Sequence, residues 1–246
     1  RSPGNPRLVL MSESYRGADL DQLTEPQSII YSARDGLSIP GYLSLPKGVE
    51  AKNLPTIVLP HGGPYARHTD RFDPWVQFLN ARGYAVLQPN FRGSYGYGSA
   101  FMGAGFKQWG MKMQDDLDDG LDWLVQQGIT DPKRACMVGG SYGGYAALVA
   151  GFKSPEKYKC AVAFAPVTDL DALVQFWRYF VTGGLPVARV QDGVERDQHS
   201  PLHRVADFKL PLLLVHGDVD RRVMIEQSQS FAKALTKAGK DFRYAI

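Results

Sequence analysis

The sequence predicts an α/β fold with a mainly parallel, doubly wound sheet and helices on both faces. Short apolar runs typical of buried strands recur along the chain, and segments with helical spacing of apolar residues separate them. Turn-forming residues mark the boundaries of both kinds of segment. Strands that alternate with helices in this way imply parallel pairing through right-handed crossovers.

The composition fits one soluble domain. The chain has 246 residues, of which 44% are hydrophobic, and this is enough to bury a full core. Its net charge is only +3, and the 28 basic and 25 acidic residues are interspersed. We therefore expect neither nucleic acid nor a membrane as a partner. Composition leaves the oligomeric state open, and it does not decide between a cytoplasmic and a periplasmic location.

The expected elements follow in order along the chain. Residues 1–27 are mostly polar and rich in turn formers, which predicts a lead-in or linker. The expected strands cover residues 28–33, 39–45, 56–60, 85–88, 160–165, 212–216 and 242–246, with one more opening the stretch 136–152. The expected helices cover residues 74–81, 114–127, 170–180 and 226–237, besides one that closes the stretch 136–152.

The chain has two cysteines, Cys136 and Cys160. Each opens an expected core strand, so we interpret them as buried thiols rather than as a disulfide or a metal-binding pair. No cluster of His, Cys and Asp has ligand spacing, and the sequence implies neither a metal nor an organic cofactor.

The most informative stretch places Ser141 between a short apolar run and an alanine-rich helical segment. Glycines flank it in the pattern Gly139-Gly140-Ser141-Tyr142-Gly143. This is the layout of a nucleophile elbow, in which a strained turn exposes a serine hydroxyl above the sheet. We expect the glycines to be required because a Cβ atom beside the serine would collide with a neighbouring element. A chain with 26 glycines can also produce this pattern by chance. The interpretation of Ser141 as a nucleophile therefore depends on whether an oxyanion hole and the other triad residues occur elsewhere in the sequence.

Two other strand ends supply candidate partners. His-Gly-Gly-Pro at 61–64 follows an expected strand and exposes backbone N–H groups, as an oxyanion hole requires. The amide of Gly63 would then join the amide of Tyr142, although an ordinary glycine turn is the alternative. The strand at 212–216 ends before Asp218 and Asp220, and either could be the acid of a Ser-His-Asp triad. A solvated acidic turn is the alternative here.

The sequence offers no clear candidate for the catalytic base of such a triad. In the order Ser, Asp, His it must follow the acid, yet no histidine occurs after His216. His61, His68, His199, His203 and His216 are more plausible as structural or surface residues than as a transposed base.

With these residues in view, the chain resembles the catalytic domain of the prolyl oligopeptidase family of serine peptidases, particularly its acylaminoacyl and dipeptidyl peptidase-like branches. The resemblance is carried by the segments HGGP (61–64), PNFRGSYGYG (89–98), GGSYGGY (139–145), SPLHRVADFKLPLLLVHGDVDRRV (200–223) and IEQS (225–228).

This resemblance implies an α/β-hydrolase fold with Ser141 as nucleophile and selects Asp220 over Asp218 as the acid. It places Arg222 where members of the family hold a main-chain carbonyl of the substrate. The primary specificity pocket would be lined by Tyr142, Val167, Leu170, Leu173 and Trp177. The alternative for these positions is an ordinary amphipathic core helix.

Two departures from the family pattern concern the ends of the chain. Members normally carry a β-propeller before the catalytic domain, so we expect residues 1–27 to be a linker or remnant of such a domain. The catalytic histidine normally lies about 30 residues after the acid, and we expect it beyond Ile246. Residues 28–246 would then be a catalytic domain that is incomplete at its C-terminus. Met224, where the family commonly has proline, is a minor departure.

The resulting hypothesis is a serine peptidase that hydrolyses small peptides by acyl-enzyme chemistry. A carboxylesterase of the same fold is the first alternative, because the same machinery serves esters. A catalytically dead domain is the second, since the base is missing. For the chain of 246 residues alone we expect little or no activity.

Overall fold

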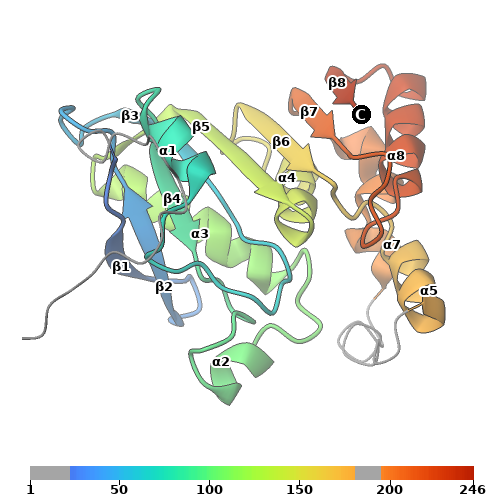
Figure 1. The fold of residues 1–246 in the computed structure, drawn as a ribbon, viewed down its shortest axis with the longest axis horizontal. Coiled ribbons are helices and arrows are strands. Elements are labelled where there is room, and N and C mark those ends of the chain that lie inside the picture. Colours follow the sequence, from blue (N-terminus) through green and yellow to red (C-terminus); the bar gives the residue numbers. More distant parts are fainter. Residues whose placement is uncertain (1–22, 181–194) are drawn as a thin grey trace, which may run out of the picture.

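The computed structural model of the chain describes residues 23–180 and 195–246. Its centre is an eight-stranded sheet with the order β1-β2-β4-β3-β5-β6-β7-β8 (Figure 1). The strands are β1 (Gln27–Ser32), β2 (Ser38–Ser44), β3 (Leu54–Val58), β4 (Ala85–Pro89), β5 (Thr130–Gly140), β6 (Cys160–Phe164), β7 (Leu212–Val215) and β8 (Phe242–Ala245).

The strand directions confirm the expected mainly parallel sheet. The hairpin β1–β2 is antiparallel, and β2 pairs antiparallel with β4. All other pairs, from β4–β3 to β7–β8, are parallel. The carboxyl ends of β3, β5, β6 and β7 therefore meet at one edge of the sheet, which is where ligand sites form in such folds.

The expected helices are confirmed, and three short ones were not foreseen. The helices are α1 (Pro74–Asn80), α2 (Ser99–Gly103), α3 (Lys112–Gln126), α4 (Tyr142–Lys153), α5 (Leu170–Phe180), α7 (Arg196–His199) and α8 (Glu226–Lys237), with a 3₁₀ segment at Pro201–Asp207. The elements α2, α7 and 201–207 span too few turns to produce a detectable helical period.

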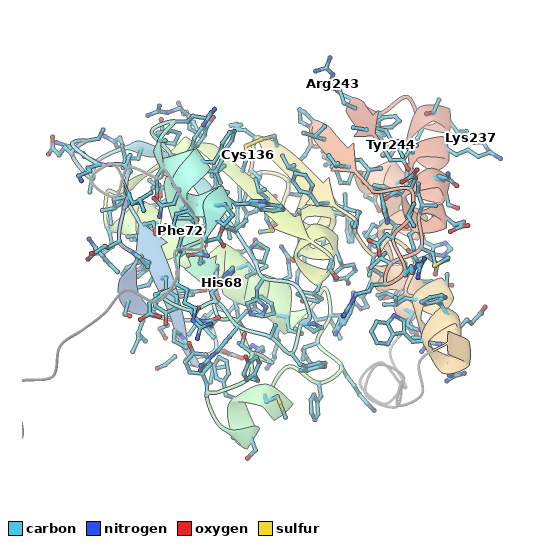
Figure 2. The ribbon with its side chains drawn as sticks, in the orientation of Figure 1. His68, Phe72, Cys136, Lys237, Arg243 and Tyr244 are labelled. Carbon is cyan, nitrogen blue, oxygen red and sulfur yellow. A yellow bond between two sulfur atoms is a disulfide. The ribbon has the colours of Figure 1, made fainter. Side chains whose placement is uncertain are left out.

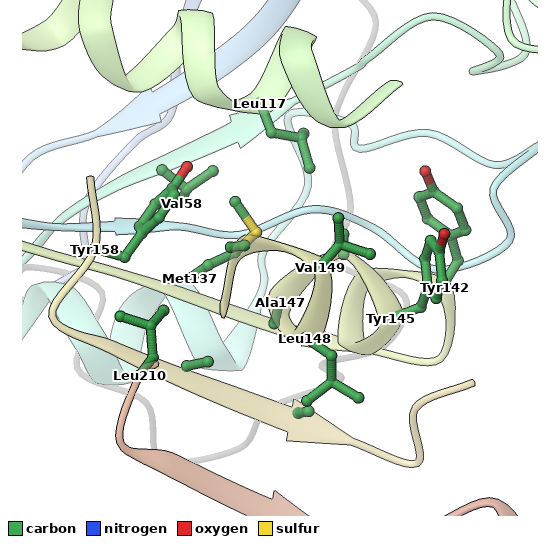
Figure 3. Close-up of a cluster of buried hydrophobic side chains, with 14 of the residues drawn as sticks. Val58, Leu117, Met137, Tyr142, Tyr145, Ala147, Leu148, Val149, Tyr158 and Leu210 are labelled. Carbon is green, nitrogen blue, oxygen red and sulfur yellow. The ribbon is translucent and has the colours of Figure 1, made fainter. Parts of the chain in front are cut away.

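The larger core lies between the sheet and the helices α3, α4 and α8. Leu117 of α3, Leu148 of α4 and Met137 of β5 are fully buried within it (Figure 3). Ten residues of α4 are buried, from Tyr142 to Gly151, so this helix is apolar nearly all round. A helix buried in this way holds its N-terminus rigidly against the sheet.

The second face of the sheet is covered less completely. Val76 of α1 packs on Ile57, Val86 and Val138 of the sheet. Beyond α1, the face over β6 and β7 has exposed apolar groups within the described residues, including Leu213, which is 38% exposed. An apolar groove of about 460 Å³ runs from α1 to Leu213 over this face. Helices thus lie on both faces, as expected, but unequally.

The expectation for the two cysteines is wrong, because Cys136 and Cys160 form a disulfide. They are register partners on the neighbouring parallel strands β5 and β6, and Figure 2 labels Cys136. Their side chains therefore leave the sheet on the same face, and the Cα atoms lie 4.9 Å apart, within the range for disulfides. Both residues are half-buried rather than enclosed in the core.

The expected lead-in is described only in part. Residues 1–22 lie outside the described part, but Thr24 is held on α1, where its N–H donates to Gln77 Oε1 at 2.9 Å.

In the described ranges, no helix combines the length and the apolar character needed to span a bilayer.

Candidate active site

Ser141 sits on a sharp turn between β5 and α4. It adopts φ 57° and ψ −119°, an unfavourable conformation for a residue with a side chain. Two backbone hydrogen bonds hold it there: the N–H of Ser141 donates to Phe164 O, and its carbonyl accepts from Tyr145 N–H, both at 2.9 Å. The strained serine on a strand-to-helix turn has the geometry of a nucleophile elbow.

The glycines around Ser141 differ in what they do. A Cβ on Gly139 would lie 2.4 Å from the carbonyl carbon of Gly143, and a Cβ on Gly143 would lie 2.2 Å from Pro60 O. These two positions therefore require glycine. Gly140 does not, because a Cβ there would meet only ordinary contacts of 3.8–3.9 Å with Phe164 and Trp75. The expectation that every flanking glycine avoids a collision is thus wrong at Gly140.

The His-Gly-Gly-Pro loop passes directly beside the serine. A Cβ on Gly62 would lie 3.4 Å from Ser141 Cβ and 4.0 Å from Ser141 Oγ. Gly63 has φ +119°, which only glycine adopts readily, and a Cβ there would crowd the amides of Tyr65 and Ala66. Tyr142 is the first residue of α4, so its N–H has no acceptor within the helix. The loop and the helix start are thus both adjacent to the Ser141 hydroxyl.

His61 anchors this loop through hydrogen bonds and ring stacking. Its Nδ1 lies 2.7 Å from Gly62 O and its Nε2 lies 2.9 Å from Ser94 Oγ. Its ring stacks on Phe91 with centroids 4.4 Å apart. Burial lowers the pKa of His61 to about 3, so the ring is neutral at physiological pH. It is a structural histidine, as expected.

Asp220 lies in the loop that follows β7. Its Oδ1 accepts hydrogen bonds from the N–H groups of Arg222 (2.7 Å) and Val223 (3.1 Å), which orients the carboxylate. Its Oδ2 lies 3.7 Å from His216 Nε2. Asp218 is exposed instead. Of the two aspartates left open by spacing, Asp220 is therefore the one whose carboxylate is held by backbone N–H groups of its own loop.

The same loop is fastened by buried side chains. His216 Nε2 donates to Val223 O at 2.8 Å, and His216 Nδ1 accepts from Ser228 Oγ at 2.7 Å. His216 is 1% exposed, and both of its ring nitrogens are engaged. Histidine at this position therefore supports the acid loop rather than the serine.

None of the chain's five histidines is bonded to the nucleophile. All five lie in the described residues, and no hydrogen bond joins any of them to Ser141 Oγ. Ser141 and Asp220 follow strands that have β6 between them, and two strand spacings amount to about 10 Å.

The residues expected to line a specificity pocket are mostly buried in the larger core. Tyr142, Val167, Leu170 and Leu173 are each at most 5% exposed and share one hydrophobic cluster, against which Trp177 packs. Leu173 also borders a cavity of about 130 Å³ between α5 and α8. Arg222 is exposed on the acid loop. Packing in the core, the alternative for α5, is therefore observed for Leu170 and Leu173 of that helix.

Gln227, at the start of α8, is a site residue that sequence reasoning missed. Its Oε1 accepts from the N–H groups of Thr168 and Asp169, both at 2.7 Å, and its Nε2 donates to Asp169 O at 3.0 Å. These bonds fix the turn that leads into α5. Ser228, the next residue, holds His216, so the first turn of α8 joins the acid loop to α5. The only sequence signal was the IEQS segment.

Arg92 fixes the segment that follows β4. Its guanidinium forms ion pairs with Asp116 at 2.7 Å and Asp35 at 2.8 Å, and Asp116 is fully buried. The network ties the segment to α3 and to the β1–β2 turn. In the described part of the chain, no group of three or more His, Cys, Asp or Glu residues could hold a metal ion.

Together these features define a class. A mainly parallel sheet that carries a serine on a nucleophile elbow, with an acid after a later strand, is the α/β-hydrolase fold. The chain matches the prolyl oligopeptidase family over residues 70–246 and belongs to that family.

Individual relatives agree with this assignment. The dipeptidyl aminopeptidase BIII of Pseudoxanthomonas mexicana is 36% identical over 230 residues, covering 87% of this chain and 33% of the relative. A puromycin-hydrolyzing peptidase of Mycobacterium tuberculosis superposes with a TM-score of 0.85 at 27% identity, covering 94% of this chain and 36% of that structure. An acylaminoacyl peptidase of Pyrococcus horikoshii gives a TM-score of 0.80 at 27% identity, covering 91% and 37%. The chain thus spans about a third of the length of these relatives.

Proposed function

We propose that the protein carrying this chain is a serine peptidase that hydrolyses small peptides through an acyl-enzyme at Ser141. The observation that carries this proposal is the strained Ser141 with the His-Gly-Gly-Pro loop against it, where a Cβ on Gly62 would come within 4.0 Å of the hydroxyl. The printed names of the relatives, a dipeptidyl aminopeptidase, an acylaminoacyl peptidase and a puromycin-hydrolyzing peptidase, support the class of substrate.

The proposed chemistry begins with attack of Ser141 Oγ on the scissile carbonyl carbon. The N–H groups of Gly63 and Tyr142 bind the oxygen that becomes negative in the tetrahedral intermediate. A histidine takes the serine proton and later delivers it to the leaving amine, while Asp220 orients that histidine. Losing one oxyanion donor typically lowers the rate by about 10²–10³.

The base is proposed to come from a segment outside these 246 residues. His61, His68 and His216 have both ring nitrogens engaged, and none of the five histidines contacts the hydroxyl by a hydrogen bond. A serine hydroxyl without a base is a weak nucleophile. We therefore propose that residues 28–246 form most of a catalytic domain and that residues 1–27 connect it to a preceding domain.

Substrate binding is proposed for the residues around Arg222 and α5. The exposed Arg222 would hold a main-chain carbonyl of the peptide, because a guanidinium presents several donors in a fixed fork. Tyr142, Val167, Leu170, Leu173 and Trp177 would contact the side chain on the acyl side of the scissile bond. Two observations support this role: Tyr142 directly follows Ser141 in the chain, and Leu173 borders the cavity between α5 and α8.

Turnover assays on the full-length protein test the proposal. Peptide p-nitroanilides and short acyl esters are compared at matched enzyme concentration, with Ser141→Ala as the blank. The proposal predicts that peptide anilides are hydrolysed and that Ser141→Ala loses this activity. Hydrolysis of esters alone would indicate a carboxylesterase, and no turnover by a folded protein would indicate a dead domain.

A further inference from the structure

A cavity of about 370 Å³ opens beside Ser141 on the side away from α5. It is lined by Gly62 and Gly140, which flank the nucleophile, and by His68, Phe72, Pro74 and Trp75 from the segment that enters α1. His68 and Phe72 mark this segment in Figure 2. Its volume lies in the usual range for ligand pockets, roughly 300–1,000 Å³.

The loop that lines this cavity and the helix α5 follow different strands of the sheet, and the wall residue Trp75 also packs on Phe164 of β6, with ring centroids 4.6 Å apart. The strand β5 lies between β3, whose loop lines the cavity, and β6, which leads into α5. A peptide with its acyl-side residue against α5 therefore extends its leaving-group residue towards α1. The cavity is where the side chain of that leaving residue would lie.

The walls favour an apolar occupant. Phe72 and Trp75 are 37% and 38% exposed, so they present aromatic surface to the cavity. The polar wall groups are already engaged: His68 Nε2 donates to Leu59 O, His68 Nδ1 accepts from Gln88 Nε2, and Asp73 Oδ1 accepts from Trp75 N–H. Burial lowers the pKa of His68 to about 4, which leaves its ring neutral.

Gly140 keeps the cavity open. The elbow does not require glycine there, since φ of Gly140 is not positive and a Cβ would meet only Phe164 and Trp75 at ordinary distances of 3.8–3.9 Å. A longer side chain would leave the backbone towards Trp75, which lines the cavity. Glycine is thus dispensable for the turn but leaves space beside the nucleophile.

We propose that this cavity binds the side chain of the residue immediately after the scissile bond, with a preference for aromatic and large apolar side chains. The proposal rests on the proposed peptidase function and deepens it by naming a leaving-group specificity. Gly140 and Trp75 are its specificity-determining residues.

Acyl transfer measures this site separately from the acylation step. The full-length protein is acylated by one donor substrate, and phenylalanine amide or glycine amide is added as a competing acceptor. The amine nitrogen attacks the carbonyl carbon of the Ser141 ester, the bond to the serine oxygen breaks, and the amine proton is returned to that oxygen. By microscopic reversibility the acceptor occupies the leaving-group site.

We expect phenylalanine amide to be preferred over glycine amide by about tenfold to a hundredfold, from burial of one aromatic side chain. Gly140→Leu should reduce the preference to within about threefold. Gly103→Leu is the matched control, because a Cβ at Gly103 meets nothing within 4 Å, and it should retain the preference. An equal partition between the two acceptors in the wild-type protein would overturn the inference.

Labelling of Ser141 by an organophosphonate shows whether the Gly140→Leu elbow is intact. If this variant is not labelled, Trp75→Ala decides: a reduced preference supports the site, and an unchanged preference overturns it. Failure of the wild-type protein to form an acyl-enzyme with any donor would overturn the peptidase function itself. An acyl-enzyme without acceptor preference overturns the leaving-group site alone.

Discussion

The two sides of the candidate site are built from different kinds of contact. On the nucleophile side, which comprises β3, β5, α4 and the loop at 61–64, backbone packs against backbone through Gly139 and Gly143. On the acid side, which comprises β7, α5, α8 and the Asp220 loop, buried side chains form the contacts through hydrogen bonds: Gln227 holds the backbone of Thr168, and Ser228 bonds to the ring of His216. The first side depends on steric exclusion and the second on a few buried polar atoms.

This difference predicts how each side fails. A close-packed turn tolerates no added atom, so one methyl group should disrupt it. A hydrogen-bonded loop should lose stability in moderate steps as single partners are removed.

The largest effect is expected at Gly143. In Gly143→Ala the new Cβ would lie 2.2 Å from Pro60 O, so either the elbow or β3 must move. We expect a loss of more than about 3 kcal/mol in the free energy of unfolding, measured by urea denaturation, together with loss of Ser141 labelling. Gly140→Ala is the matched control and should change stability by less than about 1 kcal/mol. Equal stability of the two variants would contradict the steric account.

The disulfide links β5 of the nucleophile side to β6, the strand that lies between the two sides in the sheet. Cys136 and Cys160 are 24 residues apart, and a bond that closes a loop of this length stabilises the fold by about 3.5 kcal/mol in the chain-entropy model. We expect dithiothreitol to lower the free energy of unfolding of the wild-type protein by that amount. The double variant Cys136→Ala/Cys160→Ala should not respond to the reductant. Two titratable thiols in the denatured, unreduced protein would contradict the bond.

A smaller effect is expected on the acid side. Ser228→Ala removes the donor to His216 Nδ1 and leaves that buried nitrogen unpaired, at a cost of about 1–3 kcal/mol. Ser230→Ala changes an exposed serine of the same helix and should have little effect. Chemical denaturation measures both variants. Equal losses in the free energy of unfolding for Ser228→Ala and Ser230→Ala would contradict the proposed role of Ser228 in holding His216.

The smallest expected effect is a pH dependence of the free energy of unfolding, which arises from a buried carboxyl group of α3. Asp118 of α3 accepts a hydrogen bond from Tyr158 Oη at 2.8 Å, and burial raises the pKa of Asp118 to about 6. The folded state therefore binds a proton more tightly than the unfolded state. This residue's contribution to stability should rise as pH falls from about 7 towards 4.

Asp118→Asn removes that titration. The variant should be more stable than the wild-type protein at pH 8, by on the order of 1 kcal/mol, and this advantage should disappear near pH 4. Unfolding experiments across this pH range measure the difference. An advantage that does not change with pH would contradict the raised pKa.

The difference between the two sides also decided what could be predicted from the sequence. The nucleophile side could be predicted because its requirements are local in sequence. A strained serine needs glycine at fixed offsets, and Gly139 and Gly143 are both in place. The strands and long helices were readable from their apolar periods. The functional difference between Gly140 and its neighbours was not, because it depends on whether atoms of α1 and β6 lie nearby.

The acid side was less readable because its contacts are long-range. Gln227 bonds to Thr168, 59 residues away, and no local pattern marks that pairing. The disulfide depends on the register of β5 against β6, which apolar runs alone do not specify. The resemblance selected Asp220, and its two backbone hydrogen bonds then supported the choice.

Ser141 as nucleophile is the central claim, and covalent labelling tests it most directly. The full-length protein is treated with an organophosphonate, digested and analysed by mass spectrometry, with Ser141→Ala as the control. The account predicts one adduct on the peptide that contains Ser141 and none in the variant. A folded wild-type protein that remains unlabelled, or that carries the adduct at another residue, would contradict it.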